Sequence, residues 1–122
     1  MKCIKIEPHK KPELVEVGGD LESLQKAVDG YIEVTYPWDD FVGVICNEEG
    51  KINGMELNRA LRDEYGEIYD IVAGTFLIVG LTDDNFGDIP EDLVDKYLKM
   101  FESPEEFVRI NGRIAVVQTE VL

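Results

Sequence analysis

The sequence predicts a single α+β domain over residues 1–122, built on a mixed, mostly antiparallel sheet that carries two or three helices. Three observations predict this fold class. The longest apolar run, residues 68–80, is rich in Val, Ile and Phe, which is typical of a strand covered on both faces. Short alternating segments near the N-terminus indicate a hairpin. A chain of 122 residues is also long enough to bury a real core.

The N-terminal elements follow the order hairpin, helix, strand. Residues 2–7 and 13–17 alternate between polar and apolar side chains, with a proline-containing turn between them. Asp20 is a predicted N-cap for a helix over residues 21–29. Residues 31–36 predict the next strand. This order is β-grasp-like, although several other α+β folds begin in the same way.

The middle of the chain contains the predicted central strand. Residues 41–46 predict a strand, and residues 57–61 predict either a single helical turn or a loop. The apolar run at 68–80 predicts one long strand, which Gly74 interrupts with a bulge or a close backbone contact. A helix is expected to begin at proline 90 and to end near residue 101.

The C-terminal segment predicts a short helix and a last strand. Ser-Pro-Glu-Glu at 103–106 matches a capping box with proline at the first helical position, so we expect a helix that carries Phe107. Asn-Gly at 111–112 is a turn signal, and residues 113–121 predict the final strand.

Charge is the strongest compositional feature of the chain. The sequence has 12 basic and 26 acidic side chains, a formal net charge of −14. This balance disfavours non-specific binding to nucleic acid or to an anionic membrane, because both depend on Lys and Arg. It is compatible with a basic protein partner, with imitation of nucleic acid, or simply with solubility. The N-terminus lacks the apolar block of a signal peptide, and no apolar run is long enough to span a membrane, so we expect a cytoplasmic protein.

Familiar catalytic and cofactor signatures are absent from the sequence. There is no phosphate-binding loop and no dinucleotide fingerprint, and the single histidine, His9, lies in a proline-flanked turn. Acidic pairs such as Asp39-Asp40 and Asp83-Asp84 lack the ordered spacing of a calcium loop. We therefore predict no catalytic residue, no cofactor and no metal, and a non-enzymatic role. Cys3 and Cys46 lie in apolar runs, which favours two buried reduced thiols over a disulfide or a metal pair.

The segment 47–70 is the candidate binding site. Amide, guanidinium and phenol groups are concentrated there, and such groups read polar planar ligands: Arg binds carboxylate or phosphate bidentately and Tyr stacks on rings. The alternative is a long connection held by its own Asn turns and Arg–Asp pairs. The candidate ligand-binding residues are Asn47, Asn53, Asn58, Arg59, Arg62, Tyr65, Tyr69 and Asp70.

Several motifs resemble one uncharacterised family. They are Gly-Tyr-Ile-Glu-Val at 30–34, Asn-Glu-Glu-Gly-Lys at 47–51, Leu-Asn-Arg-Ala-Leu at 57–61 and the 15 residues at 66–80. They resemble the domain of unknown function 3846, found in small proteins of bacteriophages, plasmids and gut Firmicutes. The similarity extends from the first strand to about Arg109. The resemblance implies no reaction or ligand. It implies that the chain is a mobile-element protein that acts inside a bacterial host.

Two function hypotheses follow from these observations. The first is a non-enzymatic, oligomeric counter-defence protein that sequesters a small nucleotide-like immune signal. In it Arg59 and Arg62 would meet phosphate, Tyr65 and Tyr69 would stack, and the other candidate residues would hydrogen-bond to base or ribose. The second is an acidic inhibitor, in the manner of a DNA mimic, that docks on a basic host protein. Carboxylates that line one face at about phosphate spacing, with Arg59 and Arg62 paired with them, would favour the second hypothesis. Both arginine side chains pointing unpaired into a pocket would favour the first.

Overall fold

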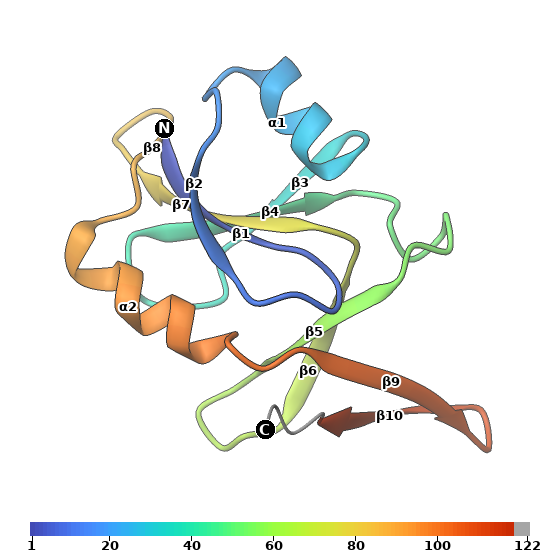
Figure 1. Cartoon of the computed structure of the whole chain (residues 1–122). Coiled ribbons are helices and arrows are strands. Elements are labelled where there is room, and N and C mark those ends of the chain that lie inside the picture. Colours follow the sequence, from blue (N-terminus) through green and yellow to red (C-terminus); the bar gives the residue numbers. More distant parts are fainter. Residues whose placement is uncertain (119–122) are drawn as a thin grey trace.

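The computed structural model describes residues 1–118, which form three layers around a central six-stranded sheet (Figure 1). The order in the sheet is β2-β1-β7-β4-β3, with β8 paired to β7, and every strand pair among the described residues is antiparallel. The predicted α+β class with a mostly antiparallel sheet is confirmed. The strands of this sheet are β1 (Lys2–Ile6), β2 (Glu13–Glu16), β3 (Ile32–Thr35), β4 (Val42–Asn47), β7 (Phe76–Leu81) and β8 (Phe86–Gly87).

Both faces of the sheet are covered. Helix α1 (Leu21–Val28) packs on one face, where Leu24 and Val28 meet Leu77 and Val79. Helix α2 (Glu91–Met100) covers the other face together with β5 and β6 (Figure 1). Successive side chains of β7 alternate between the two cores, so Phe76 and Ile78 belong to the second face. A central strand with two buried faces must be apolar throughout, as this one is.

The predicted first helix is confirmed. The Asp20 carboxylate caps it by accepting the backbone N–H of Ser23 at 3.2 Å and the hydroxyl of Ser23 at 2.7 Å. The helix ends at Asp29, which adopts the left-handed conformation with φ +59°. No helix among residues 1–118 is both long and apolar enough to cross a membrane.

The prediction of one long strand at 68–80 is wrong. The run divides into β6 (Ile68–Ala73) and β7, and β6 leaves the main sheet to pair with β5 (Leu57–Arg62). Gly74 causes the division because its φ of +77° turns the chain, where a bulge would have continued it. The prediction of a helical turn or loop at 57–61 is also wrong, since pairing with β6 overrides the helical preference of its Leu, Arg and Ala residues.

The predicted helix after residue 103 is a strand. Residues Glu105–Ile110 form β9, which pairs with β10 (Arg113–Gln118) as a hairpin. The Glu105 carboxylate faces the protein and accepts the backbone N–H of Ala60 at 3.1 Å, so it does not cap a helix. The final strand is confirmed as far as residue 118, and the rest of the predicted range lies outside the described residues.

Both cysteines are free thiols, and burial raises the pKa of Cys3 from 9.0 to about 11. Burial thus favours the protonated thiol of Cys3 over the thiolate. The stability that this preference gives the folded chain is present below pH 9.0 and is lost as the pH rises towards 11. The fully buried Cys3 should account for a loss of about 2 to 3 kcal/mol over this range. Urea titrations at both ends of the range should show a smaller loss for Cys3→Ala than for the unmodified chain. Equal losses would contradict the prediction.

Candidate functional site

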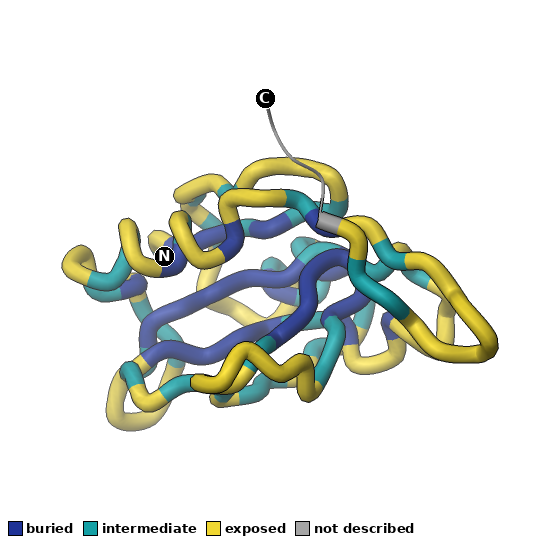
Figure 2. The backbone as a smooth tube through the Cα atoms, turned by 90° about the horizontal axis from the view of Figure 1, so that it is seen from below, coloured by how far each residue is buried: buried dark blue, intermediate teal, exposed yellow. Residues whose placement is uncertain are grey.

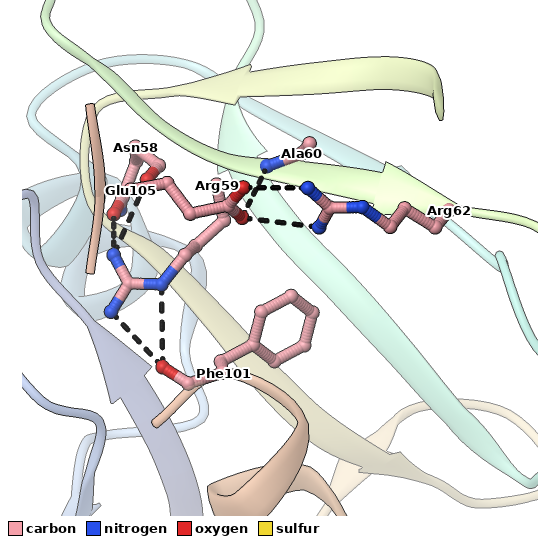
Figure 3. Close-up of polar contacts among 6 residues, drawn as sticks. All are labelled: Asn58, Arg59, Ala60, Arg62, Phe101 and Glu105. Atoms are coloured by element: carbon pink, nitrogen blue, oxygen red, sulfur yellow. Dashed lines mark hydrogen bonds and ion pairs between the residues drawn. The ribbon is translucent and has the colours of Figure 1, made fainter. Parts of the chain in front are cut away.

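Arg59 lies inside the protein, with no part of it exposed to solvent. Its Nε and Nη2 donate to the carbonyl oxygen of Phe101 at 3.3 and 3.0 Å, and Nη2 also donates to the carbonyl of Lys10 at 2.7 Å. Its Nη1 donates to the side-chain and backbone oxygens of Asn58, at 2.8 and 3.3 Å (Figure 3). The guanidinium therefore joins β5 to the end of α2 and to the β1–β2 turn. Burial lowers the pKa of Arg59, as expected for a cation away from water.

Asn58 is the second fully buried polar residue of β5. Its side-chain amide donates at 2.9 Å to the carbonyls of Ile6 and Gly74, and its Oδ1 accepts from Arg59. Asn47 plays a similar part on the other side of the sheet, where its amide donates to the carbonyls of Val28 and Asp29 at 3.2 and 3.0 Å. These two amides satisfy backbone groups at a helix end and at strand ends.

Arg62 forms a bidentate ion pair with Glu105, at 2.8 and 3.3 Å (Figure 3). Glu105 is almost fully buried and Arg62 is about one-third exposed, so the pair closes the space between β5 and β9. Arg59 and Arg62 are the two arginines expected to bind phosphate, and neither points unpaired into a cavity. Arg62 pairs with a carboxylate, whereas the oxygens that Arg59 binds belong to carbonyl and amide groups. The arrangement expected for ligand capture, both arginines unpaired in a pocket, is therefore not found.

The remaining candidate residues lie at the surface. Tyr65 is 82% exposed at the β5–β6 turn, and Tyr69 is 52% exposed on β6. Burial, with Asp70 and Asp63 nearby, raises the pKa of Tyr69. Asp70 pairs with the Lys51 ammonium, and Asn53 lies exposed in the turn after β4. The structure thus brings Arg62 and Tyr69 together at one cleft and places Asn47, Asn58 and Arg59 in the interior.

A cleft of about 780 Å³ lies between the β3–β4 loop, the β5–β6 turn and the C-terminal end of α2. Its aromatic wall contains Trp38, Tyr69 and Phe101, and the ring centroids of Trp38 and Phe101 are 6.0 Å apart. A second aromatic contact, 4.7 Å between the Trp38 and Tyr97 centroids, holds the indole against α2. We call this site the acidic cleft. Its other lining residues are Pro37, Asp39, Asp40, Ala60, Leu61, Arg62, Asp63, Glu64, Gly66, Lys96 and Met100.

Carboxylates outnumber cations in the acidic cleft by four to two. Both cations are already paired, Arg62 with Glu105 and Lys96 with Asp40. Hydrogen bonds from Lys96 and from the Tyr97 hydroxyl hold the pKa of Asp40 below its usual value. Asp39 and Glu64 are exposed, and the side chain of neither forms an ion pair or hydrogen bond within residues 1–118. The cleft therefore presents uncompensated negative charge beside aromatic rings.

Sequence reasoning missed the contribution of Trp38 and Glu64 to this site. The Pro37-Trp38-Asp39-Asp40 stretch indicates a turn, and nothing in it shows that α2, far along the chain, lies opposite. A lone tryptophan beside two acids in a turn is the signal that could have pointed to it. No group of three or more His, Cys, Asp or Glu side chains among residues 1–118 is placed to hold a metal ion.

Comparison with known proteins confirms the family resemblance. Residues 1–102 match the model of the Domain of unknown function (DUF3846). The match ends after α2, so the β9–β10 hairpin lies beyond it. Neither a curated protein nor a solved structure matches the chain.

Proposed function

We propose that this chain, which belongs to the family Domain of unknown function (DUF3846), is a non-enzymatic binding protein whose acidic cleft receives a basic segment of a partner protein. The observation that supports this proposal is the combination, in one cleft, of an aromatic wall with unpaired carboxylates. In the mobile-element setting that the family resemblance implies, the partner is a host defence or nucleic-acid-binding protein. The chain would then act as a counter-defence inhibitor in the cytoplasm of the bacterial host.

An arginine or lysine side chain is the group that fits this chemistry. Cations bind over the faces of Trp and Tyr rings, with the strongest attraction at Trp. Trp38 and Tyr69 are aromatic residues that line the cleft, while Asp39 and Glu64 supply carboxylates that an incoming guanidinium can pair with. A volume of about 780 Å³ lies within the usual range of binding clefts, roughly 300 to 1,000 Å³.

The charge of the whole chain supports the same kind of partner. A net charge of −14 attracts a basic surface over long range and speeds association at low ionic strength. The proposal therefore predicts that binding weakens as salt is raised, since the attraction is screened beyond roughly 10 Å at 0.1 M salt.

Trp38 makes the proposal testable, because it is the single tryptophan of the chain and it lines the acidic cleft. Titration with a short arginine-rich peptide should change its fluorescence in a saturable manner. The double variant Asp39→Asn/Glu64→Gln should bind the peptide about tenfold more weakly, since each exposed carboxylate contributes up to about 1 kcal/mol.

The matched control is Glu48→Gln/Asp84→Asn, which removes the same charge from exposed positions outside the cleft. It should bind the peptide like the unmodified chain at moderate salt. Equal weakening by both double variants would show attraction to the overall charge only. Such a result, or a peptide that leaves the Trp38 fluorescence unchanged, would contradict binding in the cleft.

Capture of a nucleotide-like signal is a second candidate for the same cleft. The observation in its favour is that Arg62 and Tyr69, two of the residues expected to bind such a ligand, both line it. The four carboxylates there oppose an anionic ligand, and Arg62 would have to exchange Glu105 for phosphate. Isothermal titration with a panel of cyclic nucleotides separates the two candidates. A measurable heat of binding with one cyclic nucleotide, which disappears when the arginine-rich peptide is present, would favour nucleotide capture.

A further inference from the structure

The β9–β10 hairpin exposes an apolar face to solvent. Residues directly opposite each other in the hairpin share a side, and the register pairs Val108 with Ala115 and Glu106 with Val117. Val108, Ile110 and Val117 are 42%, 57% and 47% exposed. Figure 2 shows the contrast between this hairpin, which is mostly yellow and teal, and the dark blue strands of the main sheet. We call this side the hairpin face; its residues are Glu106, Val108, Ile110, Arg113, Ala115 and Val117.

We propose that the hairpin face is a self-association surface, on which a second copy of this chain packs around a two-fold axis. The proposal concerns a surface apart from the acidic cleft, because none of the six residues lines that cleft. It does not depend on the function proposed above.

Local charge is the first argument for a second copy. Residues 1–102 carry ten basic and 23 acidic side chains, so two copies repel each other over most of their surface. Residues 103–118 carry two acidic and two basic side chains and are neutral. Two acidic molecules can therefore meet at the hairpin with little repulsion.

The arrangement of charge on the hairpin face is the second argument. Glu106 lies at the end near the body of the protein, Arg113 lies at the turn end, and apolar side chains lie between them. Glu106 and Arg113 occupy diagonally opposite corners of the face, so a two-fold axis that lies in the plane of the face and is perpendicular to this diagonal brings Glu106 of each copy towards Arg113 of the other. Such a self-complementary patch is the requirement for an isologous dimer. The side chains of Glu106 and Arg113 form no ion pair with other residues of the described chain, so both are available.

The stability of the hairpin is the third argument. Within residues 1–118, β10 pairs with β9 alone, and a two-stranded hairpin is marginal in water unless another surface packs against it. Its inner side meets β5 and carries Ile114, which is 40% exposed, while its outer side carries the more exposed Val108, Ile110 and Val117. Packing two outer faces together buries apolar area on both copies and strengthens both hairpins.

Sedimentation of the full chain over a range of micromolar concentrations tests the proposal. We expect a concentration-dependent approach to twice the 13.8 kDa mass of one chain. Val108→Thr/Val117→Thr keeps the β-branched shape and should weaken self-association about tenfold by removing apolar surface. Far-UV circular dichroism confirms that this variant is folded.

A charge exchange then tests the two-fold arrangement. Glu106→Arg and Arg113→Glu should each weaken the dimer about tenfold, since each replaces two attractive contacts by repulsive ones. The double variant Glu106→Arg/Arg113→Glu should restore it. Glu48→Arg is the matched control, because it makes the same charge change at an exposed turn. A monomer at every concentration, or a dimer insensitive to the valine changes, would overturn the proposal. A double variant that fails to restore self-association would overturn the two-fold contact.

Discussion

Replacement of Arg59 by methionine is expected to lower the free energy of unfolding by about 3 to 5 kcal/mol, because each buried acceptor left without its donor costs roughly 1 to 3 kcal/mol. Methionine matches the length of the arginine stem but donates no hydrogen bond. The carbonyl of Phe101 and the amide oxygen of Asn58 would be left buried without this donor, and the part-buried carbonyl of Lys10 would lose it as well. The loss is large because one guanidinium joins three separate parts of the chain.

Urea denaturation at fixed protein concentration measures this effect. Arg109→Met is the control, since Arg109 is exposed and forms no ion pair within residues 1–118, and it should change stability by less than about 0.5 kcal/mol. Arg59→Lys should be intermediate, because one ammonium cannot reach all the acceptors of the guanidinium fork. A change below about 1 kcal/mol for Arg59→Met would show that the network is dispensable, and would reopen Arg59 as a ligand-binding residue.

Gly80→Ala is expected to have a comparably large effect, a loss of about 3 kcal/mol or more. A methyl group at Gly80 would lie 1.9 Å from the carbonyl oxygen of Asp88 and 2.7 Å from its carbon. Both are backbone atoms, so relief requires movement of the segment that follows β8. That segment is itself tied to β1, where the N–H of Ile89 donates to the carbonyl of Lys2 at 2.9 Å.

Gly43→Ala is the matched control for this prediction. Gly43 lies in β4, which pairs with β7, and it is buried like Gly80. An added methyl group there meets only side chains, at 3.4 Å or more. Its effect should stay within about 1 kcal/mol, because alanine also restricts the unfolded chain. Similar thermal midpoints for the two variants would contradict the predicted clash.

Elements with signals close together in the sequence could be predicted well. Helix α1 has its cap at Asp20 and its apolar spacing within one short stretch, and both operate in the structure. The hairpin β1–β2 has its turn and its alternation in one short stretch. In each case a few adjacent residues determine the secondary structure, so it can be predicted without knowledge of distant contacts.

Segments whose conformation depends on distant partners could not be predicted. Residues 57–61 have the composition of a helix, but in the structure they pair with β6. Ser-Pro-Glu-Glu at 103–106 has the pattern of a helix start, but Glu105 turns inward to bind Ala60 and Arg62. Ala60 and Arg62 lie 45 and 43 residues from Glu105, so the local pattern at 103–106 carries no trace of them. The strand β6 is nearer in the chain, but local helix propensity carries no trace of its pairing with β5 either.

The candidate site shows the same limit. Asparagine and arginine were selected because they recognise ligands, and the same groups recognise buried carbonyls equally well. Only burial separates the two uses, and burial is a property of the folded chain: Asn58 and Arg59 are enclosed, while Arg62 and Tyr69 reach the acidic cleft.

The sequence by itself determined the fold class, the first helix, the strong negative charge and the family, because each depends on composition or on neighbouring residues. The tertiary structure decided that the 68–80 run divides at Gly74, that Arg59 is buried in the interior, and that Trp38 and Glu64 line the same cleft. These features depend on which segments of the chain meet. The contacts stabilise the protein only after the entropy cost of bringing those segments together has been met, which local sequence does not show.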